Sequence, residues 1–104
     1  MAELVIEKTQ VGSGVEIALR GTLTTATAPQ LAENLKSFFE KEHNLDSLVF
    51  DVSKLSYISS AGLRIVRFAS KSMESSGSFS VKGCNESVME VFALTGFASV
   101  MDIS

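Results

Sequence analysis

Two adjacent serines, Ser59 and Ser60, lie where a strand-like stretch of the chain gives way to a helix-like one. The apolar run that begins at Leu48 ends at Asp51, and apolar side chains then recur at helical spacing over Ala61–Met73. We expect Ser60 to be the N-cap of that helix. At a helix N-terminus, free backbone N–H groups and the positive end of the helix dipole favour an oxyanion or a phosphate. Serine is also among the best capping residues, so the residue type by itself favours a purely structural cap.

A serine on a strand-to-helix turn also raises the question of acyl transfer. A nucleophile elbow requires Gly-x-Ser-x-Gly together with a histidine and an acid, whereas Ile58 and Gly62 lie two residues before and after Ser60. The single histidine, His43, follows the first expected helix in a polar stretch and is expected to be solvated. The chain also lacks a Walker loop and a Gly-x-Gly-x-x-Gly fingerprint. We therefore expect no enzyme activity, no catalytic residue and no cofactor.

Length and composition restrict the remaining classes of function. The chain has 104 residues, of which 45% are hydrophobic and 20% charged, with a net charge of −3. A single domain over residues 1–104 is expected, and the scattered Lys and Arg argue against direct nucleic-acid binding. The one cysteine, Cys84, excludes an internal disulfide and a thiolate zinc cluster, and no metal is expected. The sequence shows neither a signal-like N-terminus nor a bilayer-length apolar run, which predicts a cytoplasmic protein without membrane insertion.

Hydropathy patterns predict two strands and a helix in the first half of the chain. The strands cover Leu4–Ile6 and Val15–Arg20, and a glycine-rich hairpin loop joins them. The helix begins at a capping box, Thr27–Gln30, and ends at His43–Asn44. Its apolar stripe consists of Leu31, Leu35, Phe38 and Phe39.

The second half alternates strands and helices. A strand over Ser47–Val52 precedes the Ala61–Met73 helix, which ends at Ser75–Gly77. A fourth strand, a third helix capped by Asn85 and Gly96, and a short last strand follow. The apolar residues of the fourth strand are Phe79 and Val81, and those of the third helix are Val88, Val91 and Phe92. Those of the last strand are Val100, Met101 and Ile103. The order β-β-α-β-α-β-α-β predicts an α/β fold, with a mixed four- to five-stranded sheet and three to four helices packed on it.

The segment from Asp51 to Leu63 resembles the signature of STAS domains, and in particular of stand-alone bacterial anti-sigma factor antagonists. The family pattern runs from an apolar strand through Asp-x-Ser to an aromatic residue, an aliphatic residue and a serine-rich turn ending in Gly-Leu. The matching residues are Asp51, Ser53, Tyr57, Ile58, Ser60, Gly62 and Leu63. The resemblance implies a STAS-like fold for the chain, phosphorylation of Ser60, and a partner-binding surface around it. That surface would contain Ser59, Ser60, Ala61, Gly62, Arg64, Thr24 and Thr25.

Two positions depart from the family pattern. The typical antagonist has Asp immediately before its phosphorylated serine, where this chain has Ser59. The family often has Gly-x-Leu-Asp after the second strand, where this chain has Thr24 in place of the acid. The neutral residues leave open whether Ser60, Ser59 or neither is modified. For Thr24 and Thr25 we favour turn or capping chemistry.

Two charged residues near the serines have alternative roles. Arg64 lies one helical turn after Ser60 and hence on the same side of the helix, where it could steady a phosphate or pair with an acidic partner. A solvated surface arginine fits the sequence equally well. Asp51 either braces the link to Ser60 by accepting backbone N–H bonds or is a turn-forming residue without a further role.

The resemblance implies a binding protein with a charge switch. In that family the unmodified domain binds an anti-sigma factor serine kinase and so releases a sigma factor, phosphorylation breaks the complex, and a metal-dependent serine phosphatase restores it. The alternative function is a STAS interaction module outside sigma control, such as a signalling scaffold or a subunit of a transporter complex.

Overall fold

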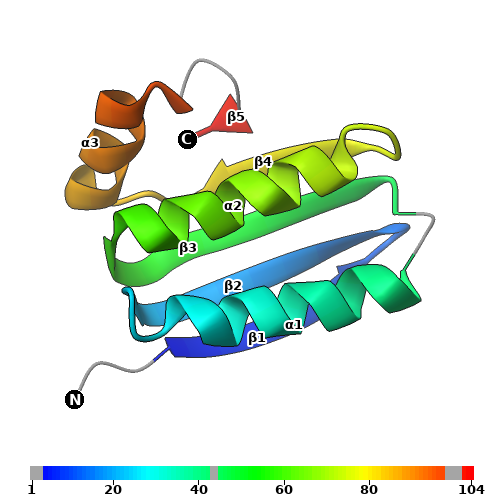
Figure 1. The fold of residues 1–104 in the computed structure, drawn as a ribbon. Coiled ribbons are helices and arrows are strands. Elements are labelled where there is room, and N and C mark those ends of the chain that lie inside the picture. Colours follow the sequence, from blue (N-terminus) through cyan, green and yellow to red (C-terminus); the bar gives the residue numbers. More distant parts are fainter. Residues whose placement is uncertain (1–3, 43–44, 98–101) are drawn as a thin grey trace.

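A five-stranded mixed sheet organises the chain (Figure 1). The computed structural model describes residues 4–42, 45–97 and 102–104. The strands of the sheet lie in the spatial order β1-β2-β3-β4-β5, with β1 antiparallel to β2 and the other neighbours parallel. The predicted fold class and element order are confirmed. The strands are β1 (Leu4–Val11), β2 (Gly14–Leu23), β3 (Ser47–Ile58), β4 (Ser78–Lys82) and β5 (Asp102–Ile103), and the helices are α1 (Ala28–Lys41), α2 (Ser60–Met73) and α3 (Glu86–Thr95).

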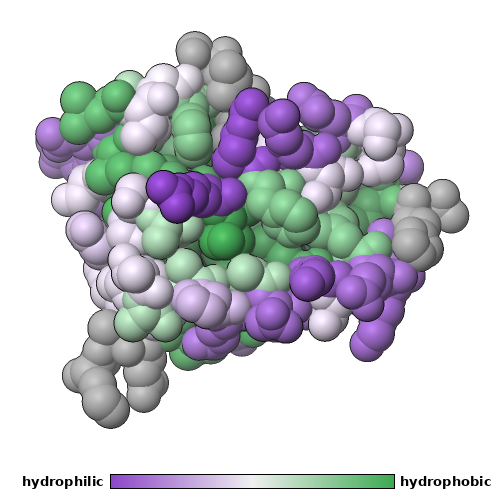
Figure 2. Space-filling model, viewed as in Figure 1, coloured by the Kyte–Doolittle hydropathy of each residue, from purple (hydrophilic) through white to green (hydrophobic). Residues whose placement is uncertain are grey.

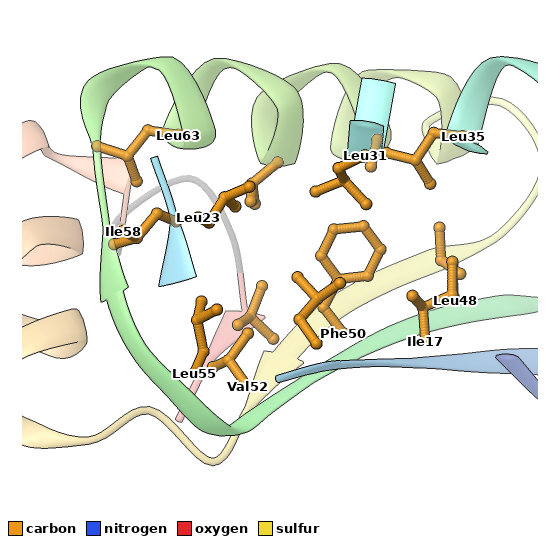
Figure 3. Packing of buried hydrophobic residues seen from close by; sticks show 14 of the residues in the cluster. Ile17, Leu23, Leu31, Leu35, Leu48, Phe50, Val52, Leu55, Ile58 and Leu63 are labelled. Carbon is orange, nitrogen blue, oxygen red and sulfur yellow. The ribbon is translucent and has the colours of Figure 1, made fainter. Parts of the chain in front are cut away.

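The core lies between the sheet and the two helices α1 and α2, which cover one of its faces (Figure 1), and it includes Val88 and Phe92 of α3. Leu31 and Leu35 of α1 point toward Phe50 in the centre of β3 (Figure 3). These side chains are fully buried, as are the alternate residues Ile17 and Leu19 of β2. The apolar stripe predicted for α1 therefore faces the sheet, and burial of this stripe stabilises the helix more than intrinsic propensity does.

Strand β3 is longer than the sequence pattern indicates, because it continues past Val52 to Ile58. Its pairing with β2 shifts between Asp51 and Lys54, where one extra residue is inserted. The bulge changes the phase of the alternation, so that Val52 and Leu55, three residues apart, are both buried. The prediction that the strand ends at Asp51–Val52 is wrong for this reason: polar residues on a bulge look like the end of a strand.

The start of α1 also differs from the prediction. Thr27 is the N-cap, but its side chain makes no capping hydrogen bond to the helix. Its hydroxyl donates instead to the carbonyl oxygen of Thr22 at 2.9 Å and accepts the Thr24 N–H at 2.8 Å. Gln30 donates to the carbonyl oxygen of Leu4 at 2.9 Å rather than returning to Thr27. The expected capping box is therefore absent, because both side chains bind the neighbouring strands.

Helix α3 begins and ends as predicted. The Asn85 side chain accepts the Val88 N–H at 2.8 Å and donates to the carbonyl oxygen of Leu55 at 3.0 Å, which joins the helix start to β3. Gly96 has a φ of 78°, the left-handed conformation of a C-cap. Strand β5 includes the predicted Ile103. The predictions for His43, Asn44, Val100 and Met101 lie outside the described residues.

Candidate functional site

Ser59 and Ser60 occupy different positions at the start of α2. Ser59 is the N-cap: its backbone is extended, its Oγ accepts the Gly62 N–H at 3.2 Å, and its carbonyl oxygen accepts the Leu63 N–H at 2.9 Å. Ser60 is the first residue of the helix and is exposed. The prediction that Ser60 is the cap is therefore wrong by one residue. Ser60 presents its hydroxyl to solvent while Ser59 holds the helix end.

This arrangement predicts unequal effects of two alanine substitutions on stability. Ser59→Ala should lower the free energy of unfolding by about 1 kcal/mol, because the Gly62 N–H loses its side-chain acceptor. Ser60→Ala should leave the free energy of unfolding within about 0.5 kcal/mol of wild type, as for most exposed positions. Urea denaturation followed by circular dichroism measures both values. A larger loss for Ser60→Ala than for Ser59→Ala would contradict the assignment of the cap.

The start of α2 packs closely on the ends of β2 and β3. The Ser59 N–H donates to the carbonyl oxygen of Leu23 at 2.8 Å, which joins the two strand ends. Gly62 is buried, and a Cβ at this position would lie 2.6 Å from Cγ of Leu23 and 3.0 Å from Cγ1 of Ile58. Glycine is therefore the residue that permits this approach, and it acts through packing. Ala61 beside it is partly buried and packs against the core.

Thr24 and Thr25 follow β2 and so lie at the same edge of the sheet as the serines, since Leu23 pairs with Ile58. Thr24 is engaged in a tight turn: its Oγ1 accepts the Ala26 N–H at 3.2 Å and the Thr27 N–H at 3.3 Å. Such a hydroxyl stabilises the turn in the way that an aspartate would. The Thr25 side chain is exposed and makes no hydrogen bond within the described part of the chain.

Two exposed side chains flank the serines. Arg64 is exposed on α2 one turn after Ser60. Tyr57, near the end of β3, is 51% exposed. The sequence pattern identifies Tyr57 as a member of the motif but not of the partner-binding surface; the signal for the second role is an aromatic residue two positions before the serines.

Asp51 does not brace the link to Ser60, because β3 continues for seven residues beyond it, roughly 20 Å of extended chain. Its Oδ1 accepts the Ser53 N–H at 3.0 Å within the bulge. This backbone hydrogen bond is the main cause of a lowered pKa for Asp51; the Ser53 side chain, Lys82 and Lys54 lower the pKa further, while burial opposes them. The side chain therefore stabilises the bulge locally, in its ionised form.

The lowered pKa gives a pH dependence of stability. A carboxyl with a depressed pKa in the folded state stabilises the protein above its unfolded pKa, about 4, and this contribution is lost as the pH falls through the folded value. Asp51→Asn should therefore be less stable than wild type at pH 7, and the difference should shrink below about pH 4. Urea denaturation at a series of pH values tests this. A difference that stays constant across that range would contradict the role of the charge.

The candidate site is a surface rather than a pocket. In the part of the chain that the structure describes, hollows of about 150 and 300 Å³ lie on the open face of the sheet beside Arg20 and Lys54, and beside Phe39 and Ser72, respectively. The first is lined in part by the motif residues Asp51 and Ser53, and neither is lined by a residue of the expected partner-binding surface. Among the described residues, no group of His, Cys, Asp and Glu is arranged to hold a metal ion. Within the same residues, every helix is too short or too polar to span a bilayer.

Comparison with known proteins identifies the family to which this geometry corresponds. A model of the STAS domain matches residues 5–104. Over 87 residues the chain is 33% identical to BtrV of Bordetella bronchiseptica, a candidate anti-sigma factor antagonist, and the match covers 83% of this chain and 73% of that protein. Both matches include the Asp51–Leu63 segment from which the resemblance was inferred, and they confirm that resemblance.

Solved structures agree on the fold. An anti-sigma factor antagonist from Mycobacterium paratuberculosis superposes with a TM-score of 0.82 at 19% identity, over 97% of this chain and 85% of that one. The phosphorylated form of the Bacillus cell fate determinant SpoIIAA gives a TM-score of 0.72 at 18% identity, over 96% and 91%. Proteins of the STAS anti-sigma factor antagonist family are non-enzymatic regulators, which agrees with the prediction of no enzyme activity.

Proposed function

The chain belongs to the STAS domain family, and on that premise we propose that it is a cytoplasmic anti-sigma factor antagonist switched by phosphorylation of Ser60. The observation that carries the proposal is that the two serines have different roles at the start of α2. The Ser60 hydroxyl is exposed at the first residue of α2, whereas the Ser59 hydroxyl is engaged with the Gly62 N–H. A kinase can therefore reach Ser60 without dismantling the helix cap.

The proposed mechanism is a change of charge on a fixed scaffold. Unmodified, the surface around Ser60 binds an anti-sigma factor serine kinase, and the sigma factor is released. A phosphate on Ser60 adds about −1.5 to −2 charges at a helix N-terminus, where the dipole and free first-turn N–H groups tolerate them. The fold persists while the surface becomes anionic and repels the partner. A metal-dependent serine phosphatase then restores the binding form.

The neighbouring Ser59 is the less suitable target for modification. Its side chain is partly buried, and a phosphate on its Oγ would disturb the hydrogen bond to the Gly62 N–H. The close packing of Gly62 against Leu23 leaves little freedom for that turn to rearrange. The same geometry explains how the chain functions without the aspartate that the family usually has at this position, because serine and aspartate are both good N-caps.

Phosphate mapping tests the proposal. The domain is co-purified from its native host, the recovered anti-sigma factor kinase is incubated with it and ATP, and the modified residue is located by mass spectrometry. We expect one phosphate on Ser60 in wild type and none in Ser60→Ala. Phosphate on Ser59 would reassign the switch. No phosphate on either serine, with a stable complex, would instead favour an interaction module outside sigma control, such as a scaffold or a transporter-complex subunit.

A further inference from the structure

Helix α2 is basic in a chain that is acidic overall. Its sequence contains Arg64, Arg67 and Lys71 but no Asp or Glu, whereas the whole chain has a net charge of −3. The ion pairs found among the described residues are Arg20–Glu7 and Lys82–Glu16, so none of the three cations on α2 is paired there. They recur at spacings of three and four residues and therefore share one side of the helix. The helix presents a positive stripe in which Arg64 and Lys71 are exposed and Arg67 is half-buried, and the acidic C-cap residue Glu74 ends the stripe one turn after Lys71.

An apolar side chain lies beside this stripe. Phe68 is 44% exposed, although its ring contacts Phe39 of α1 edge-on with centroids 6.0 Å apart. Ile65 of the same helix is also only partly buried. Figure 2 shows apolar side chains gathered between α1 and α2, bordered by hydrophilic ones. Aromatic residues and arginine are the types most enriched at the centres of protein interfaces.

We infer that the exposed side of α2, formed by Ser60, Arg64, Arg67, Phe68 and Lys71, is one continuous docking surface for an acidic protein segment with an apolar side chain that covers Phe68. Charge complementarity decides the occupant, because unpaired cations on one helix side select acidic groups and exclude basic ones. A second copy docked symmetrically through the same side of α2 would bring like charges together. The inference rests on the proposed function only in naming the partner as the anti-sigma factor.

This surface gives Arg64 a role in the switch. Ser60 and Arg64 are one turn apart on the same side of α2. A phosphate on Ser60 would lie within reach of the guanidinium, which forms strong, bidentate hydrogen bonds to phosphate. The modification would then withdraw a cation from the surface as well as add negative charge to it.

Photocrosslinking in the native host locates the partner. In the test variant, the photoreactive residue p-benzoylphenylalanine replaces Phe68. In two control variants it replaces Val11 or Leu94, apolar residues elsewhere on the fold that are 61% and 80% exposed. We expect an adduct from position 68, with the anti-sigma factor identified by mass spectrometry. Adducts only from position 11 or 94, or from none of the three, would overturn the inference. An adduct at position 68 with an acidic protein that is not an anti-sigma factor would uphold the surface and contradict the proposed function.

Affinity measurements then test the charge. The partner identified in that adduct is purified on its own for these measurements. Arg64→Glu combined with Lys71→Glu should weaken its binding by roughly tenfold or more and flatten the salt dependence of the affinity. Lys54 is an exposed cation on the open face of the sheet, and Lys54→Glu is the control for a charge reversal away from this surface; it should bind as wild type. Thermal unfolding of each variant separates loss of binding from loss of fold. Wild-type affinity of a folded double variant would overturn the inference, even if Ser60→Asp still prevents binding.

Discussion

Truncation of Phe38 to alanine is expected to lower the free energy of unfolding by about 3–5 kcal/mol, the usual cost of removing a buried aromatic side chain. Phe38 is 8% exposed on the sheet side of α1, its ring contacts Phe39 with centroids 5.3 Å apart, and Lys8 Nζ lies 5.7 Å from its centroid. The substitution removes these contacts and leaves a cavity between helix and sheet. Since small domains are stable by about 5–15 kcal/mol, much of the total would be lost.

Urea denaturation followed by circular dichroism measures this effect. Leu94→Ala is the matched control, because Leu94 is 80% exposed on α3 and its truncation removes apolar atoms that are already in contact with water. We expect the control to remain within about 0.5 kcal/mol of wild type. An unchanged denaturation midpoint for Phe38→Ala would show that α1 presents another side to the sheet.

The buried faces of the helices could be predicted from the sequence because apolar residues at helical spacing lie on one side of the helix. Leu31, Leu35 and Phe38 recur at helical spacing, and burying that stripe is the main way in which an amphipathic helix is stabilised. The length of β3 could not be predicted in the same way. Its bulge at Asp51–Lys54 depends on pairing with β2, a contact between distant segments that has no period of its own in the sequence.

In the candidate site, too, the sequence pattern predicts where an element begins, whereas individual contacts decide the role of each residue. The motif located the start of α2, but the choice between Ser59 and Ser60 as the cap depends on one hydrogen bond to Gly62. Thr27 and Gln30 have the residue types of a capping box, yet Thr27 bonds Thr22, five residues before it in β2, and Gln30 bonds Leu4 in the distant strand β1. A capping pattern indicates which hydrogen bonds a side chain can make, and contacts with neighbouring strands decide which of these hydrogen bonds form.

Ser60→Asp, a single-charge mimic of phosphoserine, is expected to weaken binding of the anti-sigma factor by about 1–3 kcal/mol, roughly 5- to 150-fold. The fold should be retained, because the first turn of α2 contains no acidic residue and an aspartate there interacts favourably with the helix dipole. Thermal stability should therefore be equal to or slightly above that of wild type. Titration calorimetry with the purified partner measures the affinity, and thermal unfolding measures the stability.

The matched control for that experiment is Ser87→Asp. Ser87 is an exposed serine in the first turn of α3, one position further into its helix than Ser60 is in α2, so the variant gains the same charge near the N-terminus of another helix. If the effect of Ser60→Asp comes from its place on the docking surface, Ser87→Asp should bind as wild type. Equal weakening by both variants would mean that net charge, rather than the surface around Ser60, governs the association. Weakening by Ser60→Asp together with a lowered thermal midpoint would show that the switch acts through the fold, against the division of roles between Ser59 and Ser60.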